Sequence, residues 1–165
     1  MDNGRKLIFM RHGKSAYPLG VADHDRPLAD RGQREAGLAG DWLRTNVGSI
    51  DLTLCSTATR TRDTLAATKL DGPVSFIPEF YGADIDTIIE ELRLVENDVT
   101  SLLVIAHWPG IPDTTLWLAE NDTGEAAQHI RTKYPTSALA VLSTDQPWDR
   151  LNNGSCHLDT FHVPR

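Results

Sequence analysis

The chain has 165 residues and a formal net charge of -7, from 16 Lys and Arg against 23 Asp and Glu. This length predicts one globular domain over residues 1–165 with a single sizeable core. The acidic balance excludes nucleic acid as an expected partner, because binding to phosphate backbones requires a positive surface. No apolar run is long enough for a signal-peptide core or a membrane span, so we expect no membrane association. Two cysteines are too few for a disulfide scaffold, so Cys55 and Cys156 are expected to be buried free thiols in a reducing cytoplasm.

Short apolar runs alternate with amphipathic stretches along the whole chain. In chain order, the predicted elements are the strand Lys6–Met10, the helix Asp30–Asn46, the strand Asp51–Cys55, the helix Ser56–Lys69, the strand Val74–Ile77, the helix Asp84–Val95, the strand Leu102–Ala106, the helices Ile111–Glu120 and Gly124–Lys133, and the strands Ala138–Ser143 and Cys156–Phe161. Asp30, Ser56 and Asp84 are expected to cap their helices, because their side-chain oxygens can accept from the first helical N–H groups. The alternation predicts βαβ units and an α/β fold in three α/β/α layers, with a mostly parallel sheet and Cys156–Phe161 near its edge.

Polar side chains directly follow four of the predicted strands. They are Arg11 and His12 after the first strand, Ser56 with Arg60 and Arg62 after the second, Glu79 after the third, and His107 after the fourth. Because ligands of open α/β sheets bind beyond the carboxyl ends of the strands, we expect a shared site there. Each histidine taken alone is equally compatible with a structural role, and Arg62 is expected to be a solvated charge on a helix face.

Two arginines and two histidines at one point have the chemistry of a phosphoryl-transfer site. A guanidinium donates two parallel hydrogen bonds to a phosphate and stays charged at any working pH. A neutral imidazole can attack phosphorus and form a phosphoryl-histidine, provided that an acceptor such as a backbone carbonyl fixes its tautomer. A second histidine can stabilise the equatorial oxygens of the transition state.

Three motifs in a fixed order carry a resemblance to a known family. The segment Leu7–Ser15 reads LIFMRHGKS, Ser56, Arg60 and Thr64 form a Ser-x-x-x-Arg-x-x-x-Thr motif, and Val104–Gly110 reads VIAHWPG. Together they resemble the histidine phosphatase superfamily, with its Arg-His-Gly (RHG) motif after an apolar strand. Further segments resemble its short branch of SixA-like phosphohistidine phosphatases, namely Asp23–Ala36, Glu79–Gly82 and Tyr134–Leu142.

This resemblance implies a phosphoglycerate mutase-like fold and a role for each matching residue. His12 would be the nucleophile, and Arg11, Arg60 and His107 would form the phosphate pocket. Glu79 stands at a place comparable to that of the general acid in larger relatives.

Four other residues near these motifs have two possible roles. Ser15 donates to the phosphate or caps a turn, and Arg26 reaches the pocket or forms an ion pair within its loop. Trp108 narrows the mouth of the pocket or offers an aromatic wall to the leaving group. Asp84 competes with Glu79 as the general acid, although it is equally suited to cap a helix.

The implied reaction is hydrolysis of phosphohistidine in a protein, by a monomer that uses no cofactor. Neither an HExxH nor a CxxC motif nor a glycine-rich nucleotide loop occurs, so no metal site is expected. Two alternatives stay open: a small-molecule phosphomonoesterase of the same superfamily, and a non-catalytic module that binds phosphorylated partners. A phosphomutase is a third, although the short chain has little room for the insertions that cap a diphosphorylated intermediate.

Overall fold

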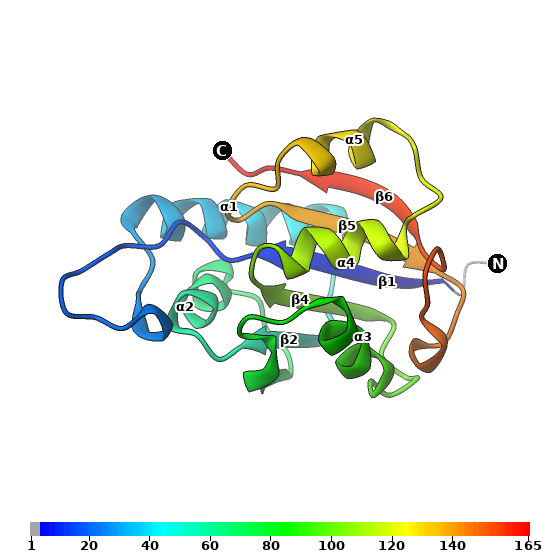
Figure 1. The fold of residues 1–165 in the computed structure, drawn as a ribbon, viewed down its shortest axis with the longest axis horizontal. Helices are drawn as coiled ribbons and strands as arrows, with labels where there is room; N and C mark the ends of the chain where they lie inside the picture. The colour runs from blue at the N-terminus through cyan, green and yellow to red at the C-terminus, as the bar shows by residue number, and fades with distance from the viewer. Residues whose placement is uncertain (1–3) are drawn as a thin grey trace.

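The computed structural model describes residues 4–165, which form one six-stranded sheet flanked by helices (Figure 1). The strands are β1 (Arg5–Arg11), β2 (Leu52–Ser56), β3 (Val74–Ile77), β4 (Ser101–Ala106), β5 (Leu139–Thr144) and β6 (His157–His162). The helices are α1 (Asp30–Asn46), α2 (Thr59–Thr68), α3 (Ile85–Arg93), α4 (Gly110–Leu118) and α5 (Glu125–Thr132), with short 3-10 helices η1 (Asp23–Asp25), η2 (Pro78–Phe80) and η3 (Trp148–Arg150). Each strand and helix predicted from the sequence is present, with ends that differ by a few residues.

The strand order in the sheet is β3-β2-β4-β1-β5-β6. The first four strands in this order run parallel to one another, whereas β5 and β6 run antiparallel to their neighbours. The prediction of a mostly parallel sheet is therefore confirmed, as is the edge position of the last strand. In the register between β1 and β4, Arg11 lies opposite Ala106, so these two central strands end side by side.

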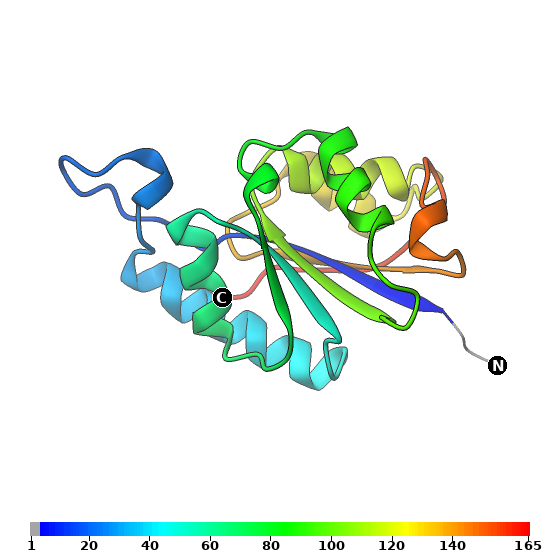
Figure 2. The ribbon, with the colours of Figure 1, turned by 90° about the horizontal axis from the view of Figure 1, so that it is seen from below.

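Helices cover both faces of the sheet, with α1 and α2 on one face and α3, α4 and α5 on the other (Figure 2). The alternation of side chains along β1 explains how one strand serves both layers. Leu7 and Phe9 are buried with the residues of α3, α4 and α5, whereas Ile8 and Met10 are buried with Leu43 and the rest of the α1 face. These two cores confirm the three-layer α/β/α architecture.

One of the three predicted helix caps is correct. Asp84 caps α3, because its Oδ1 accepts from the backbone N–H of Thr87 at 2.9 Å. The prediction for Asp30 was wrong, since Ala29 occupies the N-cap position of α1 and Asp30 is its first helical residue. The prediction for Ser56 was wrong too, since this residue ends β2 and α2 begins only at Thr59.

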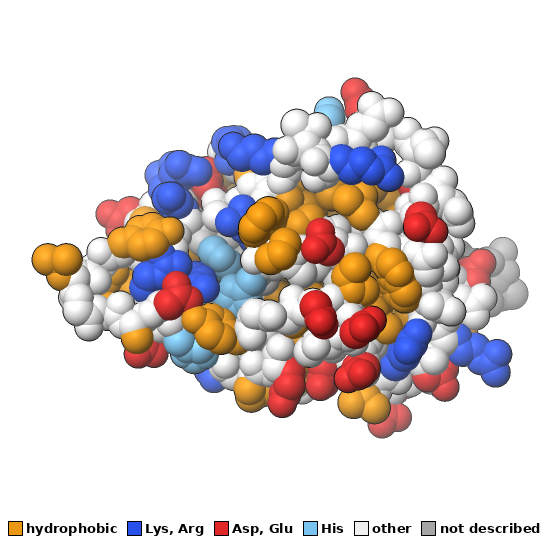
Figure 3. Space-filling view, in the orientation of Figure 1, with side chains coloured by type: hydrophobic (Ala, Val, Ile, Leu, Met, Phe, Trp, Pro, Cys, Tyr) orange, Lys and Arg blue, Asp and Glu red, His pale blue; other side chains and the backbone are white. Residues whose placement is uncertain are grey.

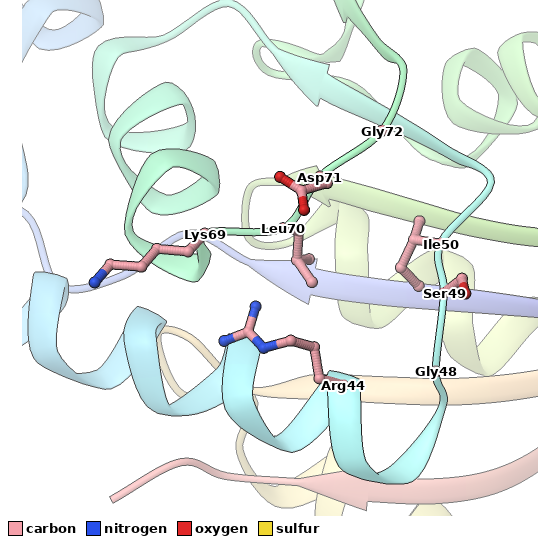
Figure 4. A pocket seen from close by; sticks show the side chains of 8 residues that line it. All are labelled: Arg44, Gly48, Ser49, Ile50, Lys69, Leu70, Asp71 and Gly72. Atoms are coloured by element: carbon pink, nitrogen blue, oxygen red, sulfur yellow. The ribbon is translucent and has the colours of Figure 1, made fainter.

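A cavity of about 540 Å³ lies where the chain leaves α1 and α2 (Figure 4). Arg44 and Lys69 border it together with the turns that lead into β2 and β3. It therefore lies at the amino ends of these strands, opposite the edge at which His12 and His107 follow their strands. In the described part of the chain, no helix combines the length and hydrophobicity needed to span a lipid bilayer.

Candidate active site

The two histidines predicted from strand ends lie together, because β1 and β4 are neighbours in the sheet. The backbone N–H of His12 donates to the carbonyl of Ala106 at 3.1 Å, which ties the end of one strand to the end of the other. The ring centroids of His12 and His107 are 5.3 Å apart, and both side chains are buried. Two residues 95 positions apart in the sequence thus share one site.

A backbone carbonyl fixes the tautomer of His12. Its Nδ1 lies 2.7 Å from the carbonyl oxygen of Gly13, which can only accept, so Nδ1 carries the proton and Nε2 carries the lone pair. Burial lowers the pKa of His12 to about 3, and the nearby His107, Arg60 and Arg11 act in the same direction, while the hydrogen bond to Gly13 opposes them. The imidazole is therefore neutral near neutral pH, which is the form that a nucleophile requires.

His107 is also neutral, but its contacts differ from those of His12. Its Nε2 lies 2.8 Å from the hydroxyl oxygen of Ser56, and its Nδ1 is buried without a hydrogen-bond partner among residues 4–165. Burial lowers the pKa of His107 to about 4, and the positive charge of Arg60 contributes to this shift. Ser56 lies two residues before the N-cap residue Ala58, so it does not cap α2; its hydroxyl accepts from the backbone N–H of Ala58 at 3.4 Å and contacts His107 from another strand.

The two arginines of the RHG and Ser-x-x-x-Arg motifs are held in a similar way. Arg11 donates from Nη1 to the carbonyl of Tyr134 at 2.9 Å, and Arg60 donates from Nη1 to the carbonyl of Asp23 at 2.8 Å. In both side chains Nε is buried and lacks a partner in the described part of the protein. Together with Nδ1 of His107, these are three buried nitrogens without partners at the strand ends, and Arg26 adds its buried Nε and Nη1 beside them. Such groups are rare in folded proteins and are typical of a site that takes a ligand.

Each of the three residues of the Ser-x-x-x-Arg-x-x-x-Thr motif contributes to the site. Ser56 is hydrogen-bonded to His107, and Thr64 Oγ1 accepts from the backbone N–H of Gly13 at 2.9 Å. Arg60 contributes its buried and unpartnered Nε. The spacing of four residues brings Arg60 and Thr64 to the same face of α2, and Thr64 donates to the carbonyl of Arg60 at 2.7 Å. This helix therefore links the end of β2 to the loop behind the ring of His12.

Gly13 and Gly32 meet at a close backbone contact behind the nucleophile position. A Cβ on Gly13 would lie 2.9 Å from the carbonyl oxygen of Gly32 and 3.1 Å from Ser137 Oγ. A Cβ on Gly32 would overlap the carbonyl oxygen of Lys14. A side chain at position 13 would therefore clash with the backbone of α1. The glycine of the Arg-His-Gly motif avoids this clash, and its carbonyl oxygen contacts the ring of His12.

The remaining predicted residues lie around this centre. Ser15 is buried and forms a backbone bridge with Leu28. Arg26 lies 3.2 Å from a carboxylate oxygen of Asp23 and stacks on the ring of Tyr17 at 4.0 Å, so it forms the loop ion pair considered for it. Their roles toward a ligand, and those of the residues below, stay predictions.

Trp108 exposes 61% of its surface directly after His107, as expected for a residue at a pocket mouth. Glu79 is exposed on η2 and forms neither a hydrogen bond nor an ion pair within residues 4–165. The carboxylate of Asp84 is engaged as a helix cap, and hydrogen bonds from Thr87 lower its pKa. Arg62 is exposed and donates to the carbonyl of Thr57, away from both histidines, as expected for a helix-face charge.

Two residues of the site were missed in the sequence. The carboxylate of Asp23 accepts from Arg60 and from the hydroxyl of Tyr81, and the ring of Tyr81 meets that of His107 edge-on at 5.6 Å. The sequence offered one signal for each of them: Asp23 is an acidic residue three positions before Arg26, and Tyr81 is an aromatic residue two positions after Glu79.

Charge and hydrophobic surface meet at the site. Figure 3 shows histidine surface between hydrophobic and basic side chains, with an acidic group beside it.

Among residues 4–165, no group of three or more histidine, cysteine, aspartate or glutamate side chains is arranged to hold a metal ion.

The lowered pKa values of the two histidines predict how stability depends on pH. An unfolded chain protonates histidine near pH 6.5, about the usual value, whereas folded His12 and His107 protonate only at about 3 and 4. The unfolded state therefore binds more protons below pH 6.5, and the stability that these neutral rings provide is lost as the pH falls. We expect each ring to contribute up to about 1.4 kcal/mol per pH unit to this slope between about pH 6 and pH 4.5.

Urea unfolding at a series of pH values measures this slope. The double variant with His12→Asn and His107→Asn should show a shallower dependence than the wild type, whereas His129→Asn, on the exposed surface of α5, should not. An unchanged slope in the double variant would show that the two rings are not held neutral by the fold.

Comparisons with known proteins agree with this geometry. Residues 7–88 match the histidine phosphatase superfamily (branch 1). The uncharacterized protein Rv1276c of Mycobacterium tuberculosis is 51% identical over 158 residues, covering 94% of this chain and 100% of the relative. The solved structure of a candidate phosphohistidine phosphatase SixA from Nakamurella multipartitia is 37% identical with a TM-score of 0.91, over 99% of this chain and 98% of that one.

A further solved structure is that of the protein histidine phosphatase SixA complexed with tungstate. It is 25% identical with a TM-score of 0.79, over 96% of this chain and 97% of that one. The family match covers β1, α1 and α2, which carry or support the RHG histidine and Arg60, and the similar structures extend the likeness to β4 and His107. The chain belongs to the histidine phosphatase superfamily and has its phosphoglycerate mutase-like fold.

Proposed function

We propose that the protein hydrolyses phosphohistidine in other proteins through a covalent phosphohistidine intermediate on His12. The observation that carries the proposal is the pairing of a neutral imidazole, protonated on Nδ1 by its bond to Gly13, with three buried donors that lack partners. The likeness to SixA phosphatases supports the choice of phosphohistidine as the substrate. The presence of both histidines argues against a non-catalytic module that only binds phosphate, because the two arginines alone would suffice for binding.

In the first step, the Nε2 lone pair of His12 forms a bond to phosphorus while the bond from phosphorus to the leaving group breaks. The Nδ1 proton stays on the ring, and the carbonyl of Gly13 stabilises the positive charge that the ring acquires. The free Nε groups of Arg11 and Arg60 donate to the equatorial oxygens. In the second step, a water oxygen bonds to phosphorus and the bond to Nε2 breaks, with its electron pair returning to the ring. The ring is then neutral again, and both protons of the water leave with the product as dihydrogen phosphate.

His107 provides a third donor in this mechanism. We assign the ring proton of His107 to its unpartnered Nδ1, with the hydroxyl of Ser56 donating to Nε2, because the Ser56 oxygen already accepts from the backbone N–H of Ala58. The two neutral histidines therefore have complementary roles, one with a free lone pair and one with a free N–H. The exposed ring of Trp108 and the partly exposed ring of Tyr81 offer flat surfaces for an aromatic leaving group such as imidazole.

The leaving group decides how much the reaction needs a general acid. The imidazole of phosphohistidine can be protonated on its other nitrogen near neutral pH, whereas an alkoxide needs a proton in the transition state, which is typically worth about 10²–10⁴-fold. Glu79 stays our candidate donor for alcohol leaving groups, since Asp84 is held ionised as a helix cap. A site without a strong acid favours phosphohistidine over ordinary phosphomonoesters.

A substrate panel tests the proposal. The purified protein should release phosphate from a histidine-phosphorylated protein with a higher kcat/KM than from alkyl phosphomonoesters. Exhaustive chelation should not change the rate, because the arginines supply the charge that a metal would bring. Turnover of small esters alone would indicate the small-molecule phosphomonoesterase. Phosphate binding without any turnover would indicate the non-catalytic module. A cytoplasmic monomer is part of the same proposal.

A further inference from the structure

Asp23 holds the guanidinium of Arg60 with two separate acceptors. Its main-chain carbonyl accepts from Nη1 at 2.8 Å, and its carboxylate oxygen Oδ2 accepts from Nη2 at 3.2 Å. The same carboxylate accepts from the hydroxyl of Tyr81, and its other oxygen lies 3.2 Å from Nε of Arg26. Hydrogen bonds from Arg60 and Tyr81 and the charge of the neighbouring Arg26 thus converge on one side chain of the short turn η1.

These contacts occupy one edge of the guanidinium and leave another edge free. An arginine can donate in parallel from its Nη1–Nη2 edge and from its Nε–Nη2 edge. Asp23 takes the first edge, while Nε on the second edge is buried and unpaired among residues 4–165. The Arg60 side chain is only 8% exposed, so a free donor there is costly unless a ligand accepts from it. The clamp therefore fixes the direction in which the free edge points.

The carboxylate of Asp23 is not itself suited to donate a proton. The hydrogen bond from Tyr81 lowers its pKa, and the charges of Arg60 and Arg26 lower it further, although burial opposes them. It is therefore ionised across the neutral range and acts on the site through the arginine that it holds.

We propose that Asp23 is a positioning residue that orients Arg60 so that its Nε–Nη2 edge faces the phosphoryl group at His12. This proposal rests on the proposed function, since it gives Arg60 a phosphoryl ligand. The competing hypothesis is that the carboxylate of Asp23 only competes with phosphate for the hydrogen-bond donors of Arg60. The two hypotheses predict opposite signs: loss of a positioning clamp weakens phosphate binding, whereas loss of a competing anion strengthens it.

Calorimetric titration with inorganic phosphate separates them without any need for turnover. Asp23→Ala should raise the Kd for phosphate by about tenfold, the scale of one lost hydrogen bond to a charged group. Asp23→Asn should raise it less, because its amide oxygen can still accept from Arg60. With a small aryl phosphate as substrate, KM should rise by a larger factor than kcat falls. The pH profile of turnover should keep its shape, because the variant loses no proton donor.

Asp25→Asn is the matched control. It removes the same charge from the same turn, and its side chain is 69% exposed and lies 3.7 Å from His24 rather than on an arginine. Its Kd for phosphate should equal that of the wild type, and melting temperatures should show that all three variants are folded. Tighter or unchanged phosphate binding in Asp23→Ala would overturn the positioning role alone. A wild-type protein that binds no phosphate would overturn the proposed function and this proposal with it.

Discussion

Replacing His12 by alanine is expected to lower turnover by about 10⁴-fold or more and to abolish the phosphoenzyme, because the reaction loses its nucleophile. The neighbouring groups cannot substitute for it. His107 presents its unpartnered Nδ1 rather than its Nε2, which is bonded to Ser56, and the arginines only donate. The measurement is acid-labile phosphate on denatured protein after brief mixing with substrate, together with kcat.

The matched control for this variant is His129→Ala, an identical change on the exposed surface of α5. It should leave both the phosphoenzyme and kcat unchanged. Equal amounts of acid-labile phosphate on the wild type and on His12→Ala would place the covalent phosphate on another residue.

Replacing His107 by alanine is expected to slow turnover by about 10²–10³-fold, which is typical for the loss of one preorganised donor to the transition state. The phosphoenzyme should still form, but more slowly, because the nucleophile and the bond to Gly13 are intact. Rapid-mixing measurements of phosphoenzyme formation and decay report both steps.

Two amide variants test which nitrogen of His107 matters. His107→Asn carries an N–H group close to the position of Nδ1, whereas the amide of His107→Gln reaches toward Nε2 and Ser56. We expect the asparagine variant to retain more activity than either the glutamine or the alanine variant. A more active glutamine variant would show that Nε2, rather than Nδ1, faces the phosphoryl group.

The parallel strands could be predicted from the sequence because their apolar runs are short and buried on both faces. The meeting of His12 with His107 followed from the same reasoning, since parallel neighbours place their carboxyl ends at one edge. The superfamily could be predicted from three motifs that stand in its expected order along the chain, and the likeness to SixA from the further segments Asp23–Ala36, Glu79–Gly82 and Tyr134–Leu142.

Contacts between distant loops could not be predicted. The carboxylate of Asp23 meets Arg60, 37 positions later, only because η1 folds back against α2. Ser56 has the sequence signature of a helix cap, yet its hydroxyl is bonded to His107 from another strand. In both cases the local contact is kept, from Asp23 to Arg26 and from Ser56 to the backbone N–H of Ala58, and a tertiary partner is added that the local sequence pattern does not describe.

The neutrality of both histidines has a consequence for the ionisation of the substrate. The positive charge of the pocket comes from Arg11 and Arg60, and guanidinium groups stay charged across the working range. With both rings neutral, this charge is constant from about pH 5 upward. A phosphoryl group loses its second proton near pH 6, roughly in the middle of that range. The affinity of the pocket therefore rises as the phosphoryl group becomes a dianion and then levels off, following the titration of the ligand rather than that of the protein.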